Sequence, residues 1–77
     1  MDLGKDSEFY KMYGECWNLF KKYSNPTSWE DIEAYMREAK ELEDKYHKYI
    51  NFVGACLFHY GRMIKNEYED SGVQRKM

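Results

Sequence analysis

The sequence predicts a small all-α protein, a three-helix bundle formed by one domain over residues 1–77. Apolar residues recur at spacings of three and four along most of the chain, which is the period of one helix face. There is a single proline, and no stretch alternates between apolar and polar residues as a strand would. No internal repeat and no low-complexity segment is evident. A chain of 77 residues also has room for one domain only.

The first helix is predicted over residues 7–23. Asp6 or Ser7 can cap its amino end, because a short polar side chain accepts a hydrogen bond from the first turn. One apolar stripe runs along this segment: Phe9, Tyr13, Cys16, Phe20 and Tyr23. The stripe is widened on one side by Met12 and Leu19, and on the other by Tyr10 and Trp17.

A loop over 24–28 precedes the second helix, which is predicted over residues 28–47. Pro26 disfavours helical backbone at the residue before it. The sequence Thr27-Ser28-Trp29-Glu30 fits a capping box, in which Thr27 and Glu30 would each satisfy a backbone donor. Three pairs at the favourable i,i+4 spacing indicate a solvated charged face: Glu33–Arg37, Glu41–Lys45 and Asp44–Lys48.

The helical period continues to residue 69, so two architectures compete. One helix over 28–69 would be about 60 Å long, and the first helix, at about 26 Å, would cover less than half of it. That helical hairpin would have to dimerise. A break near 47–51 instead gives a third helix over 51–69, with Asn51 as its N-cap, and three helices that cover one another. The bundle is the favoured architecture. The polar residues 71–77 are predicted to form a flexible tail.

Charge and hydropathy argue against nucleic-acid binding and membrane insertion. Lys and Arg number 12 against 14 Asp and Glu, so no strong basic surface is expected to attract phosphates. The apolar run at 50–64 is too short to span a bilayer and contains Asn51, His59 and Arg62. No signal peptide is visible, and a cytoplasmic location is expected. Cys16 and Cys56 are interpreted as reduced core thiols, with a bridge between helices as the alternative.

No motif for catalysis or for a cofactor is found, so we expect that the chain is not an enzyme. The serines lie at predicted caps or in the loop, and no phosphate-binding glycine loop or metalloprotease motif occurs. Cys56 and His59 form one short-spaced pair, whereas a structural zinc site usually needs two such pairs. We therefore expect neither a metal nor a cofactor.

Protein binding is the function class that the composition favours. Aromatic residues make up 18% of the chain, and Trp, Tyr and Arg are enriched at the centres of interfaces. Phe58 is expected to project beside Gly54 and Gly61, next to a shallow groove. The predicted protein-binding residues are Tyr10, Trp17, Phe58 and Arg62, with the acidic Glu38 and Glu41 at the rim.

Residues 9–50 also resemble small helical proteins encoded by phages, prophages and mobile elements of low-GC Gram-positive bacteria. The segments that carry the resemblance are Trp17–Tyr23, Asn25-Pro26, Trp29 and Leu42–Tyr46. The resemblance implies a mobile-element origin. It also implies that the chain binds a larger protein or a nucleoprotein complex, and that it inhibits a host defence system as anti-CRISPR proteins do. A homo-oligomeric structural protein is the alternative, so a homodimer is one of the expected assemblies.

Overall fold

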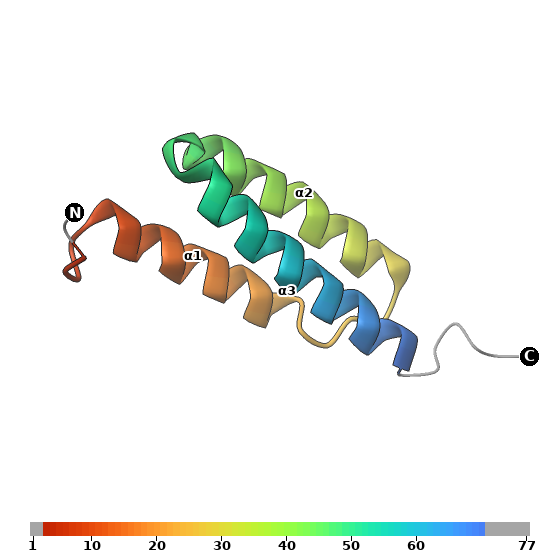
Figure 1. Cartoon of the computed structure of the whole chain (residues 1–77). Coiled ribbons are helices and arrows are strands. Elements are labelled where there is room, and N and C mark those ends of the chain that lie inside the picture. Colours follow the sequence, from red (N-terminus) through yellow and green to blue (C-terminus); the bar gives the residue numbers. More distant parts are fainter. Residues whose placement is uncertain (1–2, 71–77) are drawn as a thin grey trace, which may run out of the picture.

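The computed structural model describes residues 3–70 and shows three α-helices that pack against one another. Helix α1 spans Glu8–Lys22, α2 spans Trp29–Lys45 and α3 spans Ile50–Asp70, with a short 3₁₀ turn, η1, at His47–Tyr49. The helices lie side by side and alternate in direction (Figure 1). The predicted three-helix bundle is confirmed, and the described part of the chain has no strand. The tail predicted at 71–77 lies outside the described residues.

The break between α2 and α3 occurs at Tyr46–Tyr49, which excludes the single long helix. Tyr46 ends α2 with φ −111° and ψ 40°, and its amide donates to the carbonyl of Leu42 over 2.9 Å. The amide of Tyr49 then donates to the carbonyl of Tyr46 over 2.8 Å, which closes the turn. Because φ stays negative, this turn needs no glycine. The predicted N-cap at Asn51 is wrong, since η1 leads directly into α3 at Ile50.

Ser7 is the N-cap of α1, and it is one of the two residues that the sequence predicts for this position. Its hydroxyl oxygen accepts a hydrogen bond from the amide of Tyr10 over 3.1 Å and donates to the carbonyl of Gly4 over 2.7 Å. The side chain is buried, with 6% of its surface exposed. The hydroxyl thus acts both as a donor and as an acceptor, and its two hydrogen bonds connect the segment before α1 to the first turn of the helix.

The amino end of α2 is capped differently from the predicted capping box. The N-cap is Ser28, whose side chain makes no capping hydrogen bond. Asp31, one residue beyond the predicted Glu30, accepts from the amide of Thr27 over 2.9 Å and from its hydroxyl over 3.3 Å. The helix begins one residue later than the pattern predicts. The carboxylate that reaches back beyond the N-cap Ser28 is therefore that of Asp31, the third residue of the helix.

The core lies where the three helices meet, and it shifts the buried face of α1. Met12, Cys16 and Leu19 are buried, whereas Tyr13, at the centre of the predicted stripe, is 49% exposed. Since α1 touches both neighbours, its buried centre lies between the side facing α2 and the side facing α3. The other buried apolar residues are Ile32, Tyr35, Ala39, Tyr46, Val53, Leu57, Ile64 and Tyr68.

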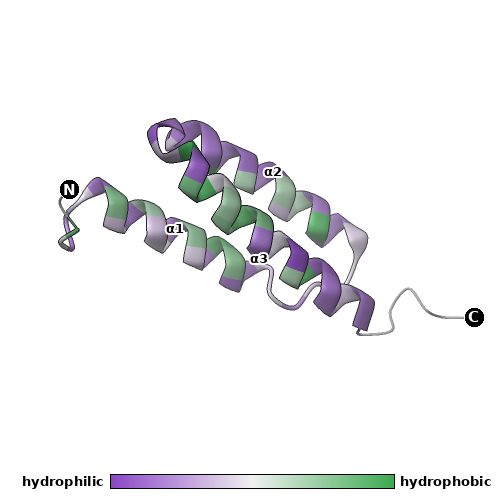
Figure 2. Ribbon diagram, viewed as in Figure 1, coloured by the Kyte–Doolittle hydropathy of each residue, from purple (hydrophilic) through white to green (hydrophobic). Residues whose placement is uncertain are grey.

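Hydropathy differs between the helices. Figure 2 shows hydrophobic residues along the first half of α3, while α2 is hydrophilic over much of its ribbon. Between residues 3 and 70, no helix combines the length and the apolar character that crossing a membrane requires.

Candidate protein-binding surfaces

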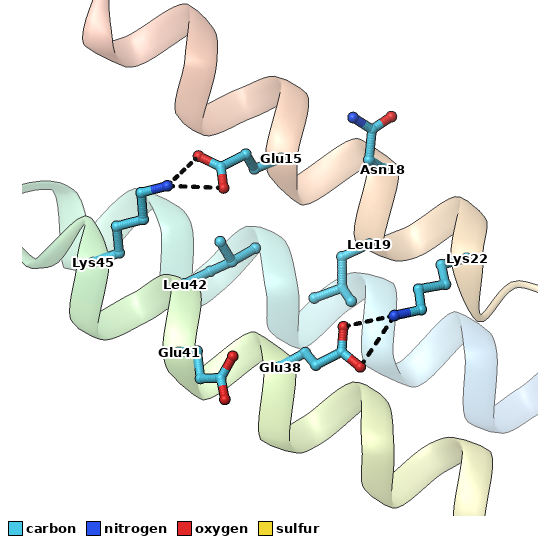
Figure 3. Close-up of a pocket in the computed structure, with 8 residues that line it drawn as sticks. All are labelled: Glu15, Asn18, Leu19, Lys22, Glu38, Glu41, Leu42 and Lys45. Atoms are coloured by element: carbon cyan, nitrogen blue, oxygen red, sulfur yellow. Dashed lines mark hydrogen bonds and ion pairs between the residues drawn. The ribbon is translucent and has the colours of Figure 1, made fainter.

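A charged groove lies between α1 and α2 (Figure 3). At one end, the carboxylate of Glu15 accepts from the ammonium of Lys45 over 3.1 Å and from the hydroxyl of Tyr46. At the other end, the carboxylate of Glu38 accepts from Lys22 over 3.1 Å and from the hydroxyl of Tyr23. Leu19, Leu42, Asn18 and Glu41 line the hollow between the two clusters, which has a volume of about 440 Å³.

The two clusters are built from the same sequence pattern. Glu15 precedes Lys22-Tyr23 by the spacing at which Glu38 precedes Lys45-Tyr46. The antiparallel helices then exchange contacts, because the Lys-Tyr pair at the end of each helix binds the glutamate of the other. This shared spacing of three residues was not predicted from the sequence. The predicted Glu41–Lys45 pair is also wrong, since Lys45 binds Glu15. Lys40–Asp44 is the pair within α2.

The two glutamates are held in their charged form. Burial alone would raise the pKa of Glu15, but the hydrogen bonds from Tyr46 and Lys45 outweigh it and lower the pKa. The hydrogen bond from Tyr23, aided by Lys22, lowers the pKa of Glu38. Each carboxylate already has two donors, so this groove fastens α1 to α2 rather than offering free charges.

A second groove lies between α2 and α3 and is more apolar. Its volume is about 620 Å³, and α1 contributes none of the lining residues. The groove therefore lies on the flank of the α2–α3 pair that α1 leaves uncovered. Its apolar lining residues are Trp29, Ile32, Tyr35, Met36, Ala39, Leu57, Phe58 and Gly61. Its charged lining residues are Lys40, Glu43, Arg62 and Lys65. We call this feature the α2–α3 groove.

The floor of the α2–α3 groove is held by Tyr35. Its ring is 2% exposed, and its hydroxyl donates to the carbonyl of Leu57 over 2.7 Å. A Cβ atom added at Gly61 would lie 3.2 Å from Cε2 of this ring, tighter than ordinary contact. Gly61 thus lets the ring approach α3 closely enough for its hydroxyl to reach the backbone.

Phe58 and Arg62, both predicted binding residues, stand together on the α3 side of this groove. The Phe58 side chain is 60% exposed, and the Arg62 guanidinium lies 5.8 Å from the centre of its ring. The His59 ring flanks Phe58 at 5.6 Å. On the α2 side, Met36 is 54% exposed and Trp29 is also exposed. Large apolar side chains therefore stand in solvent on both walls.

Trp17 lies on a different surface, between α1 and α3. The centre of its ring lies 5.7 Å from the ring centre of Phe20 and 6.4 Å from that of Tyr60. The rings of Phe20 and Tyr60 stack on each other, with their centres 4.3 Å apart. Tyr13 and Phe52 are exposed as well. Tyr10 is exposed on α1. This aromatic face is filled by rings that pack on one another.

The predicted binding residues are thus spread over three surfaces. Phe58 and Arg62 line the α2–α3 groove, Glu38 and Glu41 line the α1–α2 groove, and the aromatics of α1 lie apart from both. Sequence reasoning missed Trp29, Met36 and Lys65. The signal for the first two was present: they are seven residues apart on α2, beside the stripe of Ile32, Tyr35 and Ala39, so they form a second apolar row.

The cysteines are free thiols. Cys16 is buried and Cys56 is partly buried. Burial, with smaller contributions from Cys56 and Glu15, raises the pKa of Cys16 to about 12, so this thiol stays protonated at neutral pH. Within residues 3–70, no group of three or more histidine, cysteine or acidic side chains could hold a metal ion.

Comparison of the chain with protein-family models, curated proteins and solved structures found no match. Over residues 3–70 the chain is a small three-helix bundle with a charged groove between α1 and α2 and a more apolar groove between α2 and α3.

Proposed function

We propose that this chain is a non-enzymatic protein-binding module that occupies a surface of a larger protein in a stoichiometric complex. The α2–α3 groove is its binding surface. Phe58 and Met36 are the apolar anchors, and Arg62 is a charged contact at the rim. The observation that carries the proposal is the groove itself, whose walls expose large apolar side chains from two helices.

The physical argument concerns how much apolar surface stays in water. In a domain of this size every apolar side chain that packs inside adds to a thin margin of stability. Trp29, Met36 and Phe58 nevertheless remain 43%, 54% and 60% exposed around one hollow. Concave apolar surfaces flanked by polar groups are the usual places where proteins bind partners. Covering these side chains would contribute hydrophobic free energy that the isolated chain leaves unused.

The resemblance to phage and mobile-element proteins extends the proposal to a biological role. In that role the chain acts in the cytoplasm and blocks a host defence protein or nucleoprotein complex, as anti-CRISPR proteins do. Its supports are the small size, the helical fold and the aromatic composition.

An affinity-capture experiment tests the proposal. The wild-type chain and single alanine variants are immobilised and exposed to lysate of a low-GC Gram-positive bacterium, and retained proteins are quantified by mass spectrometry. Met36→Ala and Phe58→Ala remove groove side chains. Met63→Ala is the matched control, because Met63 is 55% exposed against 54% for Met36 but lies outside the groove. Trp17→Ala and Tyr10→Ala report on the aromatic side of α1.

The proposal expects a protein retained equally by wild type and Met63→Ala and lost from both groove variants, with a one-to-one complex in light scattering. Equal retention by the Met36, Phe58 and Met63 variants would show that the groove is not the binding surface. Loss confined to Trp17→Ala or Tyr10→Ala would move the surface to α1.

A further inference from the structure

We infer that the α2–α3 groove receives an acidic amphipathic α-helix of the partner protein, an inference that rests on the proposed function and specifies the chemistry of the partner. Three properties of the groove carry it: the charge of its rim, the shape of its floor and the effect of that charge on self-association.

The rim is cationic although the chain is acidic overall. Three basic residues and one acid line the groove, Lys40, Arg62 and Lys65 against Glu43, whereas the whole chain has 12 basic and 14 acidic residues. The ammonium of Lys40 forms an ion pair with the carboxylate of Asp44 over 3.3 Å, which offsets part of its charge. Between residues 3 and 70, Arg62 and Lys65 form no ion pair. On α2 the charge of Lys40 is offset by Glu43 and Asp44, so the positive charge stands mainly on the α3 wall, where carboxylates of a bound segment would meet Arg62 and Lys65.

The shape of the groove fits a helix. On α2 the lining residues run from Trp29 to Glu43, about 21 Å along the helix axis. A helix of three to four turns has this length. Its apolar stripe, at spacings of three, four and seven, would lie on the floor between Met36 and Phe58. The alternative of adding a strand to a sheet edge is not open, because the described residues form no sheet.

A second copy of the chain fits this groove poorly. In a twofold dimer each surface meets itself, so the groove of one copy would face the groove of the other. The rim of one copy, with three basic residues against one acid, would then meet the same rim of the other copy in a partly desolvated interface. Like charges placed together oppose association, so the rim that favours an acidic partner disfavours self-pairing.

Synthetic peptides test the inference with the full-length chain. The first is a stapled helical peptide of about 14 residues with a leucine stripe flanked by glutamates. The second has lysine in place of each glutamate, and the third is a scrambled acidic peptide without the stripe. Affinity is measured by fluorescence anisotropy, and the site by chemical-shift changes in the ¹⁵N-labelled protein.

The inference expects the acidic stripe peptide to bind about tenfold more tightly than either of the others, since several exposed ion pairs, each weak, act together. Shift changes should fall on α2 and α3 around Met36 and Phe58. The double variant Arg62→Glu with Lys65→Glu should reverse the preference between the acidic and the lysine peptide. Lys11→Glu with Lys21→Glu changes the net charge equally on exposed α1 positions and should leave the preference unchanged.

Three results would overturn the inference: equal binding of the acidic and lysine peptides, shift changes centred on the α1–α3 face, or a dimer in light scattering that Phe58→Ala dissolves. The double variant also separates this inference from the proposed function in the capture experiment. If capture needs Met36 and Phe58 but survives the Arg62 and Lys65 reversals, the groove binds a partner that is not acidic. If capture is indifferent to Met36 and Phe58, the proposed function itself fails.

Discussion

The hydroxyl of Tyr35 donates a buried hydrogen bond to the backbone carbonyl of Leu57 over 2.7 Å, and this bond joins α2 to α3 beneath the groove. Tyr35→Phe should lower the free energy of unfolding by about 1 kcal/mol. The cost stays moderate because helical geometry leaves the carbonyl with its backbone donor four residues later. Urea unfolding measures the change. Tyr10→Phe is the control, since Tyr10 is exposed. Equal unfolding free energies for Tyr35→Phe and wild type would show that the bond contributes nothing.

Two glycines in helices should respond oppositely to alanine. A Cβ at Gly14 meets no atom within 4 Å, so Gly14→Ala should stabilise the protein by up to about 1 kcal/mol through helix propensity. A Cβ at Gly61 would press on the Tyr35 ring at 3.2 Å. Because that ring is buried and hydrogen-bonded, Gly61→Ala should lower stability below wild type. Thermal unfolding of the two variants checks this, and an equal gain from both would contradict the close packing at Gly61.

Acid should weaken the two contacts between α1 and α2. The folded-state pKa values of Glu15 and Glu38 lie below the ordinary 4.5. The stability that these carboxylates contribute is therefore present above their unfolded pKa and is lost as pH falls through the lowered folded pKa. Glu15→Gln and Glu38→Gln should flatten the pH dependence of urea unfolding below about pH 5. Glu33→Gln, at an exposed position, is the control. Unchanged slopes in the first two variants would contradict this role.

Alkali should destabilise the fold through Tyr46. Burial, together with the hydrogen bond to Glu15, raises its folded-state pKa to about 12, while an unfolded tyrosine ionises near pH 10. The stability linked to the neutral phenol is complete below about pH 10 and is lost as pH rises towards about 12. Tyr46→Phe should reduce this alkaline loss. Unfolding free energies between about pH 9 and 12, with tyrosinate absorbance recorded alongside, measure it. An identical alkaline slope in wild type and variant would contradict the assignment.

The helices were predictable because apolar periodicity reports on a single helix face. The break after α2 was predicted mainly from the length of the first helix, since no glycine or proline marks it and Tyr46 turns at a negative φ. The buried centre of α1 was not predictable from the sequence, because it depends on how α2 and α3 pack on the two sides of that helix. Tyr13 has the spacing of a core residue and yet is exposed.

The surfaces were predictable only in part. Phe58 and Arg62 are close in sequence on one helix, so their shared position followed from helical spacing. Met36 joins them only when α2 packs against α3, which no local pattern reports. Glu38 looked like a free rim charge, but Lys22 and Tyr23 reach it across sixteen and fifteen residues of sequence.

The most direct test of the α2–α3 groove as a binding surface compares Met36→Ala with Met63→Ala in the capture experiment. The two methionines are almost equally exposed and lose the same atoms, so they differ chiefly in whether they line the groove. We expect Met63→Ala to retain the partner as wild type does and Met36→Ala to retain markedly less. Equal retention by both variants would contradict the groove as the binding surface.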